Sequence, residues 1–241
     1  MFIRSVDVGY GNVKYVRRQN GGFVPGHFPS IAPPHQGSDF GGDALSKKNV
    51  IRVMVDQSEY LVGPDAGLSL KNGNGRMLHQ DYIERDGYMA LVRGALAFIQ
   101  EPRIDLLVTG LPVDFYSQHR ERLVERLTGR HDYPDGSSIE VASTWVLPQP
   151  VGGFLNYATV NKNYTSLRET NVLVVDVGFY SVDWLVCRGL KAIDERSGSV
   201  DVGMSRFLDA LARLVGDDFG EPFNDINRLD IALNNRNQLD W

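Results

Sequence analysis

Two aspartate–glycine turns, each at the end of an apolar run, are the features of this sequence best suited to chemistry. Residues 6–16 read VDVGYGNVKYV, and residues 175–186 read VDVGFYSVDWLV. Glycine lets the backbone approach a ligand closely, and successive amide groups in such a turn attract an anion. An aspartate beside the turn would repel a bare phosphate, but it suits a phosphate that brings a divalent cation held through water. The repeated pattern therefore predicts a site for a nucleotide polyphosphate with Mg²⁺.

A cation follows the first of these turns. Lys14 can neutralise phosphate charge as a compact ammonium group. Two such turns facing each other would hold a triphosphate and its Mg²⁺ from both sides, which suits phosphoryl transfer. The simpler alternative is that each glycine only forms a hairpin and each aspartate only starts a turn. The sequence has no GxxxxGK[ST] loop, and Gly9-x-Gly11 lacks the third glycine of a GxGxxG turn.

Strand-like and helical segments alternate along the chain and would position these turns. Each turn lies between two runs rich in β-branched residues, which predicts a β-hairpin in each case. Helical spacing predicts helices at 82–100, 117–128, 151–161, 202–214 and 224–233, and apolar runs predict further strands at 50–55, 58–62, 103–108 and 139–146. Ser117 is the expected cap of the second helix. The alternation predicts an α/β protein.

Composition excludes several classes of protein. The 241 residues are enough for one large domain or two small ones. Cys187 is the only cysteine, so an internal disulfide is excluded and a reducing, cytoplasmic setting is favoured. Apolar runs are too short to cross a bilayer, and the histidines show no metal-binding spacing. A net charge of −5 argues against non-specific coating of nucleic acid.

Both turns also resemble the two phosphate loops of the actin, heat-shock chaperone and sugar-kinase superfamily. DVGYGNVK at 7–14 looks like the first loop, in the D-x-G-x-G-x-x-K form typical of actin-like proteins, and DVGFYSVD at 176–183 looks like the second. Four more segments are similar to plasmid-segregation actins of the ParM/StbA type and to PRTRC-system actin-like proteins: FPS at 28–30, YLVG at 60–63, TGLP at 109–112 and SGSVDVG at 197–203. The resemblance implies an actin-like (ribonuclease H-like) ATPase fold with two similar halves around a nucleotide cleft.

The resemblance also implies a role for each matching residue. Asp7 and Asp176 would hold Mg²⁺ through water and take part in catalysis. Gln149, in the segment VLPQP, would orient the attacking water, the alternative being an ordinary polar loop residue. The phosphates of ATP or GTP would be bound by the first turn with its lysine, and by the second turn, through Gly9, Tyr10, Gly11, Asn12, Lys14, Gly178, Phe179 and Tyr180.

The same resemblance divides the chain into three parts. Residues 1–22 and 81–170 would form the first actin-like domain, 23–80 a small inserted subdomain, and 171–241 the start of an incomplete second actin-like domain. The implied protein is an ATPase that forms nucleotide-dependent filaments in plasmid segregation, reaching DNA through an adaptor and contacting neither nucleic acid nor membrane directly.

Two departures from the family pattern favour other functions. Phe179 and Tyr180 are bulky where many relatives have Gly, Thr or Ser, and no match to the family's adenosine-binding Gly-Gly motif is found. Both favour a non-polymerising scaffold or binding protein with little ATPase activity. A small-molecule kinase of the same superfamily is the third alternative.

Overall fold

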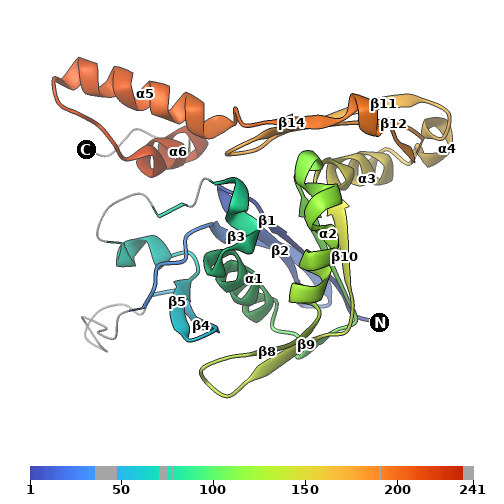
Figure 1. Cartoon of the computed structure of the whole chain (residues 1–241), viewed down its shortest axis with the longest axis horizontal. Helices are drawn as coiled ribbons and strands as arrows, with labels where there is room; N and C mark the ends of the chain where they lie inside the picture. The colour runs from blue at the N-terminus through green and yellow to red at the C-terminus, as the bar shows by residue number, and fades with distance from the viewer. Residues whose placement is uncertain (36–47, 71–74, 77–78, 190, 236–241) are drawn as a thin grey trace.

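A five-stranded sheet forms the centre of the first body of the protein (Figure 1). The computed structural model describes residues 1–35, 48–70, 75–76, 79–189 and 191–235. The sheet has the order β10-β7-β1-β2-β3, with β1, β7 and β10 parallel and the β1-β2-β3 meander antiparallel. Its strands are β1 (Ile3–Val8), β2 (Asn12–Gln19), β3 (Gly22–Pro29), β7 (Leu106–Leu111) and β10 (Thr144–Pro148).

Alternation along β1 sorts its side chains between the two faces of this sheet. Val6 and Val8 are buried in the core with helix α1 (Asp86–Ile99), whereas Asp7 between them points to the opposite face. The α1 helix is buried along most of its length, and it ends at Gln100 in the left-handed conformation. The acidic residue of the first hairpin is therefore kept out of the core by strand periodicity alone.

Smaller elements extend the first body. The hairpin of β4 (Ile51–Val55) and β5 (Ser58–Val62) packs on α1, and α2 (Val113–Leu127) packs beside β10. A separate three-stranded sheet has the order β6-β9-β8. Its strands are β6 (Arg103–Ile104), β8 (Gly129–Asp132) and β9 (Ser138–Val141), and the 3₁₀ turns are η1 (Ala66–Ser69) and η2 (Gln80–Glu84).

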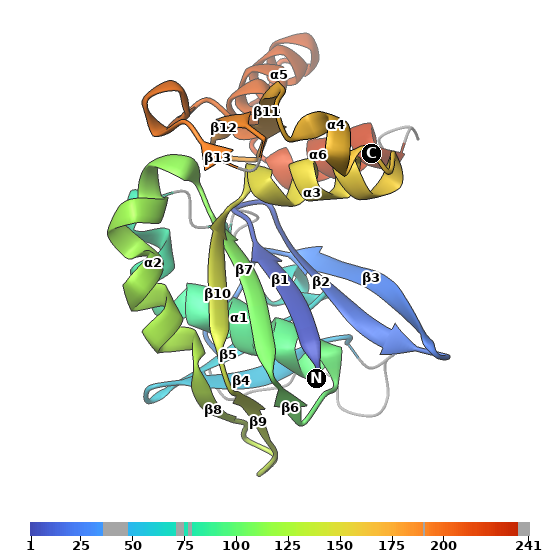
Figure 2. The ribbon, with the colours of Figure 1, turned by 90° about the vertical axis from the view of Figure 1, so that its right-hand side faces the viewer.

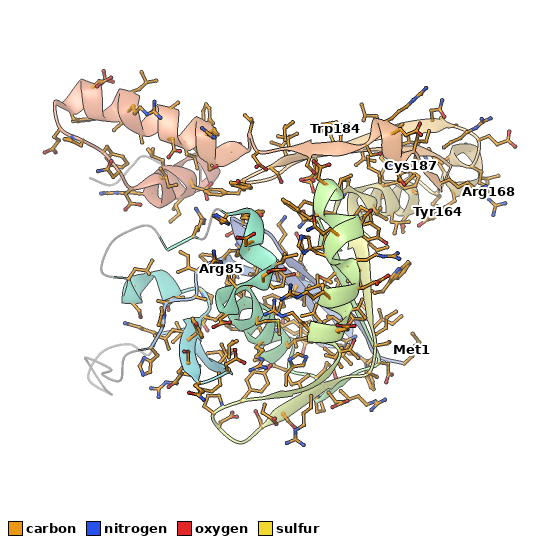
Figure 3. The ribbon with its side chains drawn as sticks, viewed as in Figure 1. Met1, Arg85, Tyr164, Arg168, Trp184 and Cys187 are labelled. Carbon is orange, nitrogen blue, oxygen red and sulfur yellow. The ribbon has the colours of Figure 1, made fainter. Side chains whose placement is uncertain are left out.

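A thinner second body lies above the first, with α3 (Pro150–Val160) between them (Figure 2). Its sheet consists of β11 (Asn171–Val177), β12 (Val182–Arg188), β13 (Lys191–Ala192) and β14 (Gly198–Val200), and α4 (Tyr164–Leu167) and η3 (Asp194–Arg196) lie in its connections. Helices α5 (Met204–Phe219) and α6 (Ile226–Asn235) share a small core of Leu208, Ala212, Ile226 and Leu229. Figure 3 labels Trp184 and Cys187 on this sheet, and Cys187 is buried as a free thiol.

The α/β class and both predicted hairpins are confirmed, whereas several predicted element boundaries are corrected. Helix α2 begins at Val113 rather than at Ser117, because Pro112 precedes its first turn. The strand predicted at 139–146 is two strands, β9 and β10, which belong to different sheets. Strand β3 pairs with β2 along its whole length, across the position at which we expected the inserted subdomain to start.

No helix in the described part of the chain combines the length and the apolar character needed to span a membrane.

Candidate functional site

The open face of the first sheet forms one wall of a cavity of about 570 Å³. The predicted residues Asp7, Asn12 and Lys14 reach it from the first hairpin. Gln149 reaches it from the end of β10, and Asp176 from the second body. The cavity therefore brings together five of the predicted residues from three separate segments of the chain.

Asp7 and Lys14 are direct partners across the first hairpin. They lie opposite each other in the antiparallel register of β1 and β2, and Lys14 Nζ is 3.6 Å from Asp7 Oδ2. The Lys14 side chain is 70% exposed, so this ion pair adds little stability. The ammonium group is thus exposed to solvent, and it can rotate away from the carboxylate toward an anionic ligand.

Gln149 contacts the same carboxylate from the other side. Its backbone N–H donates to the Leu111 carbonyl at 2.8 Å, and its side-chain Nε2 donates to Asp7 Oδ1 at 3.0 Å. Pro150 follows as the first residue of α3, where a missing N–H costs nothing. The strand end and the proline together hold Gln149 in the cavity, beside the acidic group predicted to bind the metal.

Asp176 lies in a negatively charged part of the second hairpin. It pairs with Asp183 across β11 and β12. Partial desolvation, followed by the charges of Asp7 and Asp183, raises the pKa of Asp176 above its ordinary value, and Lys14 opposes this shift. Such an environment favours any ligand that brings positive charge to the Asp176 carboxylate.

The first turn is tied to the body of the protein by its carbonyl groups. The Gly9 carbonyl accepts hydrogen bonds from the Ser30 hydroxyl at 2.5 Å and the Tyr82 hydroxyl at 3.4 Å. The Gly11 carbonyl accepts from the Ser30 N–H at 3.0 Å. Carbonyl oxygens would repel a phosphate, and here the protein's own donors engage them. Tyr10 buries its ring against Tyr82, with centroids 4.7 Å apart, so only its backbone is suited to binding a ligand.

The second turn packs directly on the first. A Cβ added at Gly11 would lie 2.8 Å from Phe179 Cβ, and the Tyr10 and Tyr180 rings lie 4.5 Å apart. We expected Phe179 and Tyr180 to bind phosphate in a turn that faces the first across the ligand. Their side chains instead fill the space between the two turn tips, and neither lines the cavity. Phe179 and Tyr180 would therefore bind phosphate through their backbone and not through their side chains.

The start of α5 supports the second turn. The N–H groups of Met204 and Ser205 donate to the carbonyls of Gly178 and Phe179, at 3.0 Å and 2.8 Å. A Cβ at Gly203 would lie 2.6 Å from the Phe179 carbonyl oxygen, so this close approach requires glycine. The SGSVDVG segment thus ends in the residue that lets α5 dock on the turn.

Asp183 is a buried acid for which the sequence suggested no role. It is 2% exposed and accepts from the Val113 N–H at 2.9 Å and from the Ser181 hydroxyl at 2.7 Å. It also accepts from the hydroxyl of Ser199, which itself accepts from the Asp114 N–H. The second body therefore caps the N-terminus of α2 in the first body. Local sequence gives no signal for this contact, since 70 residues separate its partners.

Comparison with known proteins gives one family and a set of related folds. The family model for the N-terminal domain of actin-like proteins matches residues 5–152, which is more than half of the chain. No curated protein sequence matches significantly.

Several solved structures share the fold. An archaeal actin homolog, Ta0583, is 20% identical with a TM-score of 0.71, over 95% of this chain and 71% of its own. The ParM protein of pSK41 is 18% identical with a TM-score of 0.67, over 89% and 70% of the two chains. A ParM from a Clostridium botulinum filament is 21% identical with a TM-score of 0.69, over 96% and 74%. These matches confirm the expected fold.

Proposed function

This chain belongs to the actin-like protein family, and from that premise we propose that it binds a nucleoside triphosphate with Mg²⁺ in the cavity and hydrolyses it. One observation carries the proposal. The carboxylates of Asp7 and Asp176, the ammonium group of Lys14 and the amide of Gln149 converge on one cavity from separate segments. A site of opposite charges around a glycine turn suits a metal-bound polyphosphate.

The residues present fit Mg²⁺ held mainly by water and phosphate. In the described ranges, no group of three or more His, Cys, Asp or Glu side chains is arranged to hold a metal ion. Mg²⁺ commonly keeps several waters and takes only one or two carboxylates beside the phosphates of its substrate. Asp7 and Asp176 would hold such an ion through its waters, and the positive charge would relieve the repulsion that raises the Asp176 pKa. Bound Mg²⁺ would also neutralise charge on the transferred phosphate.

Gln149 would orient the attacking water. A side-chain amide has both a donor and an acceptor. One N–H of the amide donates to Asp7 at 3.0 Å, which leaves its second N–H and its oxygen for a water. Lys14 would pair with phosphate, and the backbone of the two turns, Gly9–Asn12 and Gly178–Tyr180, would bound the phosphate site. GTP fits this description as well as ATP, because every role proposed here concerns the phosphates and none concerns the base.

We also propose how the chain divides into domains and that it self-associates. We assign the first sheet and α1–α3 to the first actin-like domain, residues after Pro29 up to about residue 80 to the inserted subdomain, and 171–241 to part of the second domain. The ParM and AlfA relatives are described as filaments. We propose that this chain likewise self-associates with bound nucleotide in the cytoplasm, in plasmid segregation. Its net charge of −5 favours an adaptor protein over direct contact with DNA.

A single substitution tests the hydrolysis and the assembly together. Asp176→Asn removes the charge with little change of shape and should lower phosphate release from Mg-ATP by about 100-fold. Nucleotide-dependent pelleting should be lost with it. Asp209→Asn, on the exposed side of α5, is the matched control and should behave as the wild type. Unchanged hydrolysis and pelleting in Asp176→Asn would exclude the proposed function.

A non-polymerising scaffold is the second candidate, and the second turn favours it. Phe179 and Tyr180 pack on the first turn, so side chains of the protein itself join the two bodies between the turn tips. Light scattering separates the two functions. Growth of the signal with Mg-ATP supports the filament, and a flat signal at high protein concentration supports the scaffold.

A further inference from the structure

The Gln149 side chain reaches Asp7 by passing over a neighbouring strand. Strand β7 lies between β10, which Gln149 follows, and β1, which holds Asp7. The parallel register pairs Ser5 with Val108, and its continuation along both strands places Asp7 beside Gly110. The hydrogen bond between Gln149 and Asp7 therefore spans the width of β7 at Gly110.

At this crossing the structure has no room for a side chain on β7. A Cβ added at Gly110 would lie 2.8 Å from Gln149 Cγ and 3.4 Å from Gln149 Cα. A contact of 2.8 Å between carbon atoms is well inside their optimal separation, so one of the two groups would have to move. Gly110 is not one of the glycines with positive φ, so its backbone conformation does not require glycine. The requirement for glycine at this position comes from Gln149 alone.

We propose that Gly110 is a positioning residue for Gln149. Its missing side chain lets the Gln149 amide lie over β7 and meet Asp7 at 3.0 Å. Gly110 acts only through Gln149, and its effect on catalysis rests on the proposed function. The contact between the two residues can also be measured in the nucleotide-free protein, where no activity is needed.

A double-mutant cycle isolates this contact. In Gln149→Ala the side chain ends at Cβ, which would lie 3.6 Å from a Cβ at residue 110, an ordinary contact. Gly110→Ala and Gln149→Ala should each lower kcat for Mg-ATP hydrolysis by about 100-fold. The KM of Gly110→Ala should change by less than about threefold, because the proposed function assigns the amide to the attacking water and not to the nucleotide. The double variant should be no slower than Gln149→Ala.

Thermal unfolding without nucleotide gives the second measurement. Gly110→Ala should lower Tm when Gln149 is present and leave Tm unchanged when residue 149 is alanine. Gly22→Ala is the matched control, since it also adds a methyl group to a strand glycine and its Cβ would lie 3.8 Å from the nearest atom, the Gln19 carbonyl oxygen. This control should match the wild type in kcat in both backgrounds.

The outcomes separate this inference from the proposed function. If the losses of Tm add and the losses of kcat multiply in the double variant, as they do for two independent sites, the role of Gly110 is overturned. A wild type that releases no phosphate would count against the proposed function, and the thermal cycle would then decide the role of Gly110. If Gly110→Ala fails to fold, folding of the double variant with Gln149→Ala supports the inference. Failure of both Gly110→Ala and the double variant to fold overturns it.

Discussion

At the scale of single residues, Asp176 is an acid whose charged form is disfavoured in the folded protein, first by partial desolvation and then by neighbouring charges. Its carboxylate lies near those of Asp7 and Asp183, and Lys14 opposes their repulsion. The raised pKa means that the folded protein disfavours the charged form of Asp176 relative to the unfolded chain. This acid therefore reduces the stability of the nucleotide-free protein at neutral pH, and the effect disappears as the pH falls and Asp176 takes up its proton.

Asp176→Asn should therefore stabilise the nucleotide-free protein while it destroys the metal site. At about pH 7 its Tm should be higher than that of the wild type, and only by a small amount because Asp176 is exposed to solvent. The gain should shrink as the pH is lowered through the raised pKa of Asp176 toward its ordinary value of 3.8, because the wild-type acid is then neutral as well. Thermal scans across this range, with Asp209→Asn as the control, test the sign. A Tm below the wild type at neutral pH would contradict it.

The same titration should appear in ligand binding with the opposite sign. A protonated Asp176 cannot hold a cation through water, so the affinity for Mg-ATP should fall as the pH drops toward the raised pKa. This loss should begin at a higher pH than for an ordinary aspartate. Isothermal titration at several pH values measures it, and Asp176→Asn should bind weakly with no such dependence on pH. A wild-type affinity that stays constant over this range would show that Asp176 does not hold the metal.

At the scale of elements, α2 depends on the other body for its cap. Pro112 precedes the helix and supplies no side-chain hydrogen bond. Asp183 and Ser199 instead accept from the N–H groups of Val113 and Asp114. A negative charge at a helix N-terminus is favourable, and more so when it is buried. The contact therefore couples the position of α2 to the second hairpin.

Asp183→Asn should weaken this coupling. The amide keeps the shape but loses the charge, and it turns a donor toward groups that already donate, so the free energy of unfolding should fall by about 2 kcal/mol. Urea unfolding measures the loss, with Asp209→Asn as the exposed control. A loss below about 0.5 kcal/mol would mean that the cap adds no stability.

At the scale of the whole molecule, Phe179 and Arg76 join the two bodies. Phe179 packs against the cores of both. Arg76 lies 4.3 Å above the Phe179 ring, donates to the Gly11 carbonyl at 3.1 Å and pairs with Asp230 of α6 at 3.3 Å. Its side chain is only 4% exposed, so these contacts replace water as its hydrogen-bonding partner. Arg76 thus contacts both turns and α6.

Arg76→Ala should loosen the second body without unfolding the first. The change removes the buried ion pair with Asp230, so amide hydrogen exchange in α6 should speed up by about tenfold or more. Exchange in α1 should stay as in the wild type. Arg85→Ala is the control, because Arg85 is exposed and pairs with Asp81 within the first body. Equal exchange of α6 in both variants would show that Arg76 does not hold the bodies together.

Local pattern in the sequence determined the hairpins and their acids. Alternation buries Val6 and Val8 and so turns Asp7 outward beside Lys14, and the glycine turns follow from backbone freedom. These features need only neighbours in sequence, and the same residues carry the resemblance to actin-like proteins. The hairpins and the family could therefore be predicted from the sequence alone.

Only the tertiary structure decided which distant groups meet. Asp7 contacts Gln149 across 142 residues because β7 lies between their strands and offers glycine at the crossing. The Phe179 side chain packs on Gly11 of the other turn, a contact that no pattern in its own segment predicts. The strand order and the docking of the two bodies determine these contacts. The periodicity of a single segment predicts neither of them. The sequence therefore determined the reactive groups, and the packing between segments determined how they are arranged.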